Sequence, residues 1–155
     1  MSIEIRDVCD QDADALAALL EQLMHQASPP TQVRSRLRRL AGSGSDRVLV
    51  AVLEGRVVGL AGVHVAWMVH ADNPTARLMS LVVDEGCRGQ GIGRRLVEAS
   101  VELSRAWGCD RLELTSRLER AGAHSFYEAV GFAHTSRRFS MPVQSTGPDP
   151  FRPAR

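Results

Sequence analysis

The 155-residue sequence contains no lysine, and it has a single tyrosine. All 19 of its basic side chains are arginines, which balance 18 acidic ones to a formal net charge of +1. A nucleotide-binding P-loop needs the run Gly-Lys-Ser/Thr, so a chain without lysine has no such loop. The near-neutral charge also argues against a nucleic-acid-binding protein, which usually carries a marked positive charge.

The sequence is also poor in cysteine, with Cys9, Cys87 and Cys109 and no Cys-x-x-Cys pair. An odd number of isolated cysteines favours reduced thiols over a disulfide framework or a zinc site. We therefore expect a cytoplasmic protein without a bound metal. No secretory leader or membrane-spanning hydrophobic run is present, so we expect no membrane partner.

Hydrophobic periodicity predicts one domain over residues 1–143, followed by a proline-rich tail over 144–155 that we expect to be disordered. Strands are predicted at 3–6, 47–53, 57–68, 77–83 and 111–115, with one or two more within 132–143. Helices are predicted at 16–24, 31–40, 91–107 and 121–130. Strands joined by tight turns pair antiparallel, whereas strands joined through a helix can pair parallel. The fold class is therefore α/β (α+β), with a mixed, mostly antiparallel central sheet flanked by helices.

Two further features of these elements bear on the site. Gly59 and Gly62 lie inside the predicted strand 57–68 and indicate a bulge or a close backbone approach.

The predicted helix 31–40 carries four arginines, for which we favour a solvated face. A surface for an acidic partner is the alternative. DNA binding through this helix would require strongly salt-dependent affinity, and the net charge disfavours it.

A glycine-rich stretch joins the predicted strand 77–83 to the helix 91–107, and it reads Arg88-Gly89-Gln90-Gly91-Ile92-Gly93-Arg94. Glycines lack the Cβ atom that would block a ligand, so successive backbone N–H groups can converge on phosphate oxygens. The helix N-terminus adds more donors and the positive end of its dipole. The dinucleotide pattern Gly-x-Gly-x-x-Gly is excluded because Arg94 and Leu96 stand where its third glycine would be. The stretch predicts a site for another phosphate-bearing ligand, with an ordinary glycine-rich turn as the alternative.

A second informative run is Ala123-His124-Ser125-Phe126-Tyr127-Glu128-Ala129-Val130-Gly131-Phe132, whose tyrosine lies 34 positions after Gly93. By itself this run is typical of a helix end with aromatic core residues. Together the two runs, Arg-x-x-Gly-x-Gly and Ala-x-x-Phe-Tyr-x-x-x-Gly-Phe, resemble the signatures of the GCN5-related N-acetyltransferase (GNAT) superfamily in their order and spacing. The resemblance extends by element order from the first strand to about Val143.

The resemblance implies a GNAT-like acyl-CoA N-acyltransferase fold. In that fold the strand before the glycine loop splays from the next parallel strand, and acetyl-CoA, the cosubstrate, lies in the gap. Its pantetheine arm would pair with main-chain groups of Leu81, Val82 and Val83. Its pyrophosphate would lie on the loop, at Arg88, Gly89, Gln90, Gly91, Ile92, Gly93 and Arg94. The opposite wall would be formed by Ser116, Arg120, Ala123 and Phe126, although many relatives carry Asn where this chain has Arg120.

The resemblance also implies transfer of an acetyl group to a primary amine by direct attack on the thioester. Tyr127 would be the general acid that protonates the departing thiolate, and the Val83 N–H would stabilise the oxyanion. The general base is less determined. Glu113 acting through water is the first candidate and His64 the second, whereas His124 favours a packing role. Proton removal through ordered water is the default.

The sequence leaves the acceptor and the assembly open. A small-molecule amine and a peptide or protein amine are equally compatible with it. Acidic residues that could meet a cationic amine are Asp10, Asp12, Asp14, Glu21 and Asp72, but caps and solvated faces also explain them. Dimers are common in the family, so a homodimer is compatible with the sequence. A non-catalytic acyl-CoA-binding or regulatory domain is the alternative function, which the presence of Tyr127 disfavours.

Overall fold

The structure is a computed structural model that describes residues 2–117, 121–144 and 147. Most of the predicted tail 144–155 therefore lies outside the described residues. The helices and strands in chain order are β1 (Ile3–Asp7), α1 (Ala13–Met24), α2 (Pro30–Ser43), β2 (Asp46–Leu53), β3 (Arg56–Ala66), β4 (Thr75–Val83), α3 (Ile92–Ala106), β5 (Leu112–Leu114) and α4 (Ala121–Ala129). Short 3-10 turns, Asp10–Asp12 and Glu85–Cys87, precede α1 and follow β4.

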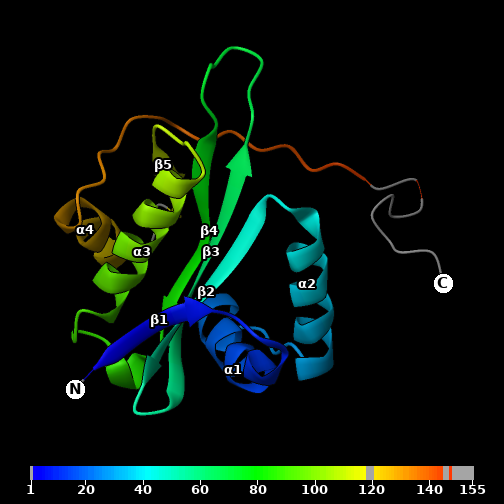
Figure 1. Cartoon of the computed structure of the whole chain (residues 1–155), viewed down its shortest axis with the longest axis vertical. Helices are drawn as coiled ribbons and strands as arrows, with labels where there is room; N and C mark the ends of the chain where they lie inside the picture. The colour runs from blue at the N-terminus through cyan, green and yellow to red at the C-terminus, as the bar shows by residue number, and fades with distance from the viewer. Residues whose placement is uncertain (1, 118–120, 145–146, 148–155) are drawn as a thin grey trace.

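The five strands form one sheet in the order β1-β2-β3-β4-β5. The first three pairings are antiparallel and the pairing of β4 with β5 is parallel. Helices α3 and α4 lie on one side of the sheet, and α1 and α2 lie on the other (Figure 1). The predicted mixed, mostly antiparallel sheet with helices on both sides is therefore confirmed. None of the described helices is long and apolar enough to cross a membrane.

The middle strands have an apolar core on both faces. Leu49 and Ala51 of β2 belong to the core under α3, whereas Val50 between them belongs to the core under α1 and α2. Alternate residues of a strand point to opposite faces, so a strand covered on both sides must be apolar at every position. This coverage explains the nearly continuous apolar run in this part of the sequence.

The two glycines of β3 lie at irregular pairings, as predicted. Ala51 pairs with Gly59 while the next residue of β2 pairs with Val57, and the ladder shifts again after Gly62. A Cβ atom on Gly59 would lie 3.1 Å from the Val82 carbonyl oxygen and 3.1 Å from a Leu96 methyl. Both the bulge and the close approach expected from these glycines are thus confirmed.

Helix α3 buries two serines that the apolar pattern does not predict. Ile92 and Leu96 face the core, and Ser100 and Ser104 are buried as well, whereas Leu103 is only partly buried. The Ser100 hydroxyl donates to the Leu96 carbonyl at 2.7 Å, and Ser104 donates to the Ser100 carbonyl at 2.6 Å. Because the helix itself satisfies both hydroxyls, small polar residues can face the core.

The start of α1 is joined to β1 by a buried ion pair. Asp12 accepts hydrogen bonds from both Nη atoms of Arg6, at 2.8 and 2.9 Å, and from the Cys9 N–H at 2.8 Å. The Asp12 side chain is 7% exposed. The Arg6 hydrogen bonds outweigh the opposing effect of burial and lower the pKa of Asp12 to about 2. Asp12 thus stands at the N-cap position of α1, but its side chain makes no capping hydrogen bond to the helix and instead fixes the helix start to β1.

Helix α2 extends beyond residue 40, where the predicted helix ended. The helix continues through Gly42 to Ser43 and ends at Gly44, whose φ is 72°. A glycine in the left-handed region commonly terminates a helix, because it has no Cβ to clash there. The stretch of glycine and serine is thus mostly the last turn of α2.

The strands predicted within 132–143 are wrong, because residues 132–144 contain no strand. Phe139, Met141 and Val143 alternate with polar residues, yet they are 91%, 83% and 87% exposed. Pro142 between them has no N–H for a ladder. This segment crosses from the α4 side of the molecule to the α2 side (Figure 1). An alternating pattern predicts a strand only where a sheet edge is available to pair with it.

Candidate functional site

The parallel strands β4 and β5 part halfway along β4. Their ladder joins 76–78 to 112–114, and β4 then continues without β5 to Val83. A bulge lies at this point, because Gly62 pairs with Ser80 but Val63 pairs with Leu78, which leaves Met79 as the extra residue. Beyond Leu78, the side of β4 that faces β5 has no ladder partner among the described residues. Its main-chain groups are placed to pair with an extended ligand, and the expected splay is confirmed.

A cavity of about 700 Å³ lies along the parted edge, a usual volume for a ligand site. We call it the first cavity. It is lined by eleven of the residues predicted to bind the cosubstrate: Leu81, Val82, Val83, Arg88, Gly89, Gly91, Ile92, Gly93, Arg94, Ala123 and Phe126. Tyr127, the predicted general acid, lines the same cavity. The fold therefore brings together the two sequence motifs that lie far apart in the chain.

Two positions of the loop require glycine, each for a different structural reason. Gly91, the N-cap of α3, has a φ of 79°, which a residue with a Cβ rarely adopts. Gly93, in the first turn of α3, faces α4, and a Cβ there would lie 3.1 Å from the Cζ atom of Phe126. The first turn of α3 also presents N–H groups that have no acceptor within the helix. A loop of this shape can hold an anion such as a pyrophosphate.

Arg88 and Arg94 stand on either side of these glycines. Arg88 Nε donates to the Val83 carbonyl at 3.1 Å, and Arg94 Nη2 donates to the Ala129 carbonyl at 3.3 Å. These bonds join the loop to β4 and to the end of α4. A guanidinium has five N–H donors, so one bond to the backbone leaves others for an anion in the cavity.

Tyr127 is held at the cavity wall by aromatic neighbours. Its ring lies edge-on to Phe126, with 5.5 Å between ring centroids, and edge-on to Phe132 at 5.8 Å. Edge-to-face packing of this kind is favourable and restricts the orientation of the ring. A packing role for these aromatic residues is therefore compatible with a catalytic role for Tyr127, because Phe126 and Phe132 position its ring.

Two of the residues considered as general bases are engaged elsewhere. Glu113 on β5 forms an ion pair with Arg77, with 3.2 Å between Oε2 and Nη2. The Nε2 atom of His124 lies 2.9 Å from the Arg117 carbonyl oxygen. Neither residue is among those that line the first cavity. A role of Glu113 as a base stays a prediction, and it would need a chain of water to reach the cavity.

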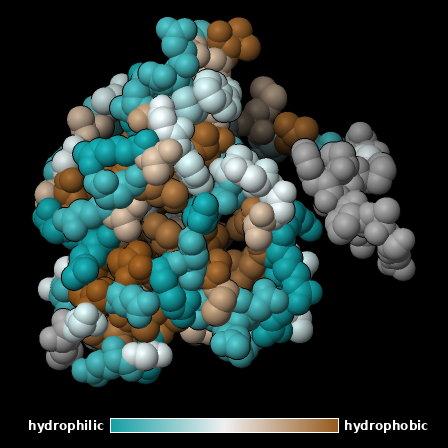
Figure 2. Space-filling view, viewed as in Figure 1, coloured by the Kyte–Doolittle hydropathy of each residue, from teal (hydrophilic) through white to brown (hydrophobic). Residues whose placement is uncertain are grey.

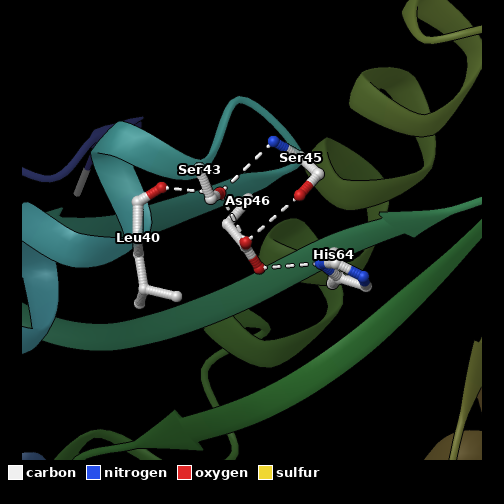
Figure 3. A network of polar contacts seen from close by, with 5 residues as sticks. All are labelled: Leu40, Ser43, Ser45, Asp46 and His64. Carbon is white, nitrogen blue, oxygen red and sulfur yellow. Dashed lines mark hydrogen bonds and ion pairs between the residues drawn. The ribbon is translucent and has the colours of Figure 1, made fainter. Parts of the chain in front are cut away.

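His64, the second candidate base, belongs to a polar network between the end of α2 and the sheet (Figure 3). Its Nδ1 atom lies 3.0 Å from Oδ1 of Asp46 on β2, the residue that pairs with it across the two strands. The other carboxylate oxygen of Asp46 accepts a hydrogen bond from the Ser43 hydroxyl at 2.6 Å. His64 does not line the first cavity either.

Other predicted contacts fall outside the cavity. Gln90 and Ser116 do not line it, and Arg120 lies outside the described residues. The sequence also missed residues that do line it, among them Gln22 and His25 from α1 and its C-cap. The Gln22 side chain accepts a hydrogen bond from the Glu85 N–H at 3.0 Å, across 63 positions of sequence. No local pattern marks such a contact, because it depends on where α1 packs.

Comparisons with known proteins agree with this geometry. The family model described as "Acetyltransferase (GNAT) family" matches residues 14–132. The chain is 28% identical to the aminoalkylphosphonate N-acetyltransferase of Salmonella typhimurium, over 88% of this chain and 89% of that protein. It is 31% identical to the aminoglycoside N(6')-acetyltransferase type 1 of Stenotrophomonas maltophilia, over 90% and 94% of the two chains. The chain therefore belongs to the GNAT family of acetyltransferases.

The fold is also shared with solved structures. One is an aminoglycoside N-acetyltransferase in complex with CoA, with a TM-score of 0.81 and 18% identity over 93% of this chain and 96% of that one. At this identity the likeness concerns the fold. Among the described residues of this chain, no group of three or more histidine, cysteine or acidic side chains is placed to hold a metal ion.

Proposed function

We propose that this protein is an acetyl-CoA-dependent N-acetyltransferase that acetylates a primary amine by direct attack on the thioester. The observation that carries the proposal is the convergence of the glycine loop and Tyr127 on one cavity, at the point where β4 and β5 part. Membership of the GNAT family supports it. A non-catalytic acyl-CoA-binding domain would explain the loop but would give Tyr127 no chemical task.

Acetyl-CoA supplies the acetyl group in activated form, as a thioester. In this proposal the main-chain groups of 81–83 pair with its pantetheine arm, and the N–H groups of 88–94 hold its pyrophosphate. The charged groups of Arg88 and Arg94 add attraction for the phosphates. Phe126 and Ala123 cover the ligand from α4. The described residues thus fit the cosubstrate along the whole first cavity.

The chemistry requires one proton to be given and one to be removed. As the carbon–nitrogen bond forms and the carbon–sulfur bond breaks, Tyr127 gives its phenolic proton to the leaving sulfur. A phenol with an ordinary pKa of about 10 is suited to protonate a thiolate. The attacking amine loses one proton to water in the cavity, and water passes a proton back to the Tyr127 phenolate, so that the enzyme is restored and the step balances. Between amine attack and loss of the thiolate, the Val83 N–H donates a hydrogen bond to the oxyanion of the tetrahedral intermediate.

The acceptor is a small molecule in this proposal. Both relatives that match about nine-tenths of the chain are named for the acetylation of small molecules, an aminoalkylphosphonate and an aminoglycoside. The three cysteines form no disulfide, which supports a cytoplasmic location. A homodimer stays a prediction.

The substitution Tyr127→Phe tests the proposal. We expect kcat for thiol release from acetyl-CoA, measured with a panel of amines, to fall about 100-fold or more. The affinity for CoA, measured by calorimetry, should stay within about twofold, because the phenyl ring keeps its packing. Phe139→Leu, a change in an exposed ring, is the control and should leave both quantities unchanged.

Two outcomes would count against the proposal. Unchanged thiol release by Tyr127→Phe would remove the tyrosine from the mechanism. If the wild-type protein binds CoA but no amine elicits thiol release, the non-catalytic alternative is correct.

A further inference from the structure

A second cavity, of about 450 Å³, lies between the helix pair α1–α2 and the sheet. Its floor is apolar, with Leu16 of α1 and Leu60 of β3 both buried. Its rim is polar and includes Ser28 and Gln32. In Figure 2, apolar residues are visible in a recess between the hydrophilic surface of α2 and the sheet. A largely apolar cavity of this size with a few polar groups is typical of a small-molecule site.

The two cavities adjoin at two places. At the end of α1, Leu23 and His25 line the first cavity and Met24 lines the second. At the sheet, Val82 of β4 lines the first cavity, and Leu60 of β3, its partner in the strand pairing, lines the second. Both side chains belong to the apolar core under α1 and α2, and residues directly opposite in an antiparallel pair have Cβ atoms about 5 Å apart. A molecule in the second cavity can therefore extend one end toward the first, beside Val82.

Arg36 is the one charged side chain among the described residues that line the second cavity. Its Nη1 atom donates to the Ser28 hydroxyl at 3.1 Å, and no described carboxylate pairs with it. Arg38 differs in this respect, because it forms an ion pair with the Asp10 carboxylate at 3.0 Å. Arg34 donates to the main-chain carbonyl of Asp10 at 3.4 Å and does not line the cavity. Arg36 thus presents a positive charge to an apolar cavity, without an acidic partner among the described residues.

We propose that the second cavity holds the acceptor, and that the acceptor is a small primary amine with an apolar body and an anionic group at its far end. The apolar floor buries the body, and Arg36 binds the anionic group by charge-assisted hydrogen bonds. The amine then lies where the two cavities meet, near Val82. A polycationic amine would meet Arg36 with no acidic side chain among the described lining residues to offset it. The inference rests on the proposed function.

The test compares ω-amino carboxylates, from β-alanine to 6-aminohexanoate, with n-alkylamines of the same length and with spermidine. For each amine we would measure kcat/KM by thiol release and equilibrium affinity by calorimetry with CoA present. We expect the best amino carboxylate to exceed its matched alkylamine by about tenfold or more in both measures, because one anion contact is lost in the alkylamine. Arg36→Gln should remove this advantage and leave the alkylamine within about twofold.

Arg38→Gln is the matched control, because it removes the same charge from the same helix outside the cavity. It should leave the preference for the amino carboxylate in place. Equal effects of the two variants, or a wild-type preference for spermidine, would overturn the inference. The calorimetric arm separates the two proposals. Binding that depends on Arg36 without thiol release would overturn the proposed function alone, whereas thiol release that favours the n-alkylamines over the amino carboxylates would overturn the acceptor class alone.

Discussion

The two cavities of this protein are built in different ways. The first takes most of one wall from a single continuous stretch, residues 81–94, where a strand, a glycine loop and a helix start follow one another. The second takes its walls from five separate helices and strands, α1, α2, β2, β3 and β4. A local motif therefore specifies the first cavity, whereas the second cavity depends on how α1 and α2 are fixed to the sheet.

The largest effect is expected where α1 is anchored, at Asp12. Asp12→Asn leaves the partly buried Arg6 without its charge partner, so the free energy of unfolding at neutral pH should fall by about 3 kcal/mol. Urea unfolding measures this change. Asp10→Asn, which removes an exposed ion pair with Arg38, is the control and should cost less than about 1 kcal/mol. Equal losses for the two variants would show that the Arg6–Asp12 pair contributes no more to stability than an exposed ion pair does.

Asp12 also makes the stability of the folded protein depend on pH. The pKa of Asp12 is about 2 in the folded protein, against an ordinary value of 3.8. The folded state therefore binds fewer protons, and the stabilisation is fully present above pH 3.8 and is lost as the pH falls through 2. The wild-type protein should lose about 2 kcal/mol more than Asp12→Asn over this range. Urea titrations of both proteins at several acidic pH values would measure the difference.

The first cavity should respond to a change at Gly93. In Gly93→Ala the new Cβ lies 3.1 Å from the Phe126 ring, so α4 must shift and the affinity for CoA should fall about tenfold. Gly42→Ala, where nothing lies within 4 Å of the added atom, is the matched control in another helix. Calorimetry with CoA measures both. An unchanged affinity in Gly93→Ala would mean that the contact between α3 and α4 does not shape the first cavity.

The smallest effect is expected at the β4 bulge. A Cβ on Gly62 would lie 2.6 Å from the Ser80 hydroxyl oxygen but 3.9 Å from the next nearest atom. Gly62→Ala should therefore destabilise the protein by about 1 kcal/mol when Ser80 is present and by much less when it is alanine. A double-mutant cycle in urea measures this coupling. A coupling near zero would show that Ser80 moves aside freely.

Much of the first cavity was predictable because its parts are close in sequence. The glycine loop and the end of β4 form a wall from residues whose relative positions are set by strand, turn and helix geometry. The aromatic run on α4 became predictable through its spacing from that loop. His25 and Gln22 were not, because they reach the cavity through the packing of α1 and leave no local pattern.

The errors have the same physical origin. Phe139 and Met141 alternate as a strand would, yet no strand forms there, because pairing depends on an edge and not on the pattern alone. Ser100 looks like a solvent-facing residue in the sequence, but its bond to the Leu96 carbonyl lets it face the core. Glu113 is a different case, because its role as a base stays a prediction, but its pairing with Arg77 became visible only across two strands.

By itself, the sequence determined the family, the order of the elements from the first strand to the last helix and the position of the glycine loop, because these depend on residue spacing over short distances. The tertiary structure decided which residues line the two cavities and which charges are already paired. Those properties depend on contacts between distant segments, such as Gln22 with Glu85, and on the packing of α1 and α2 against the sheet. Arg36 illustrates the difference, since in the sequence it is one arginine of four on the same helix.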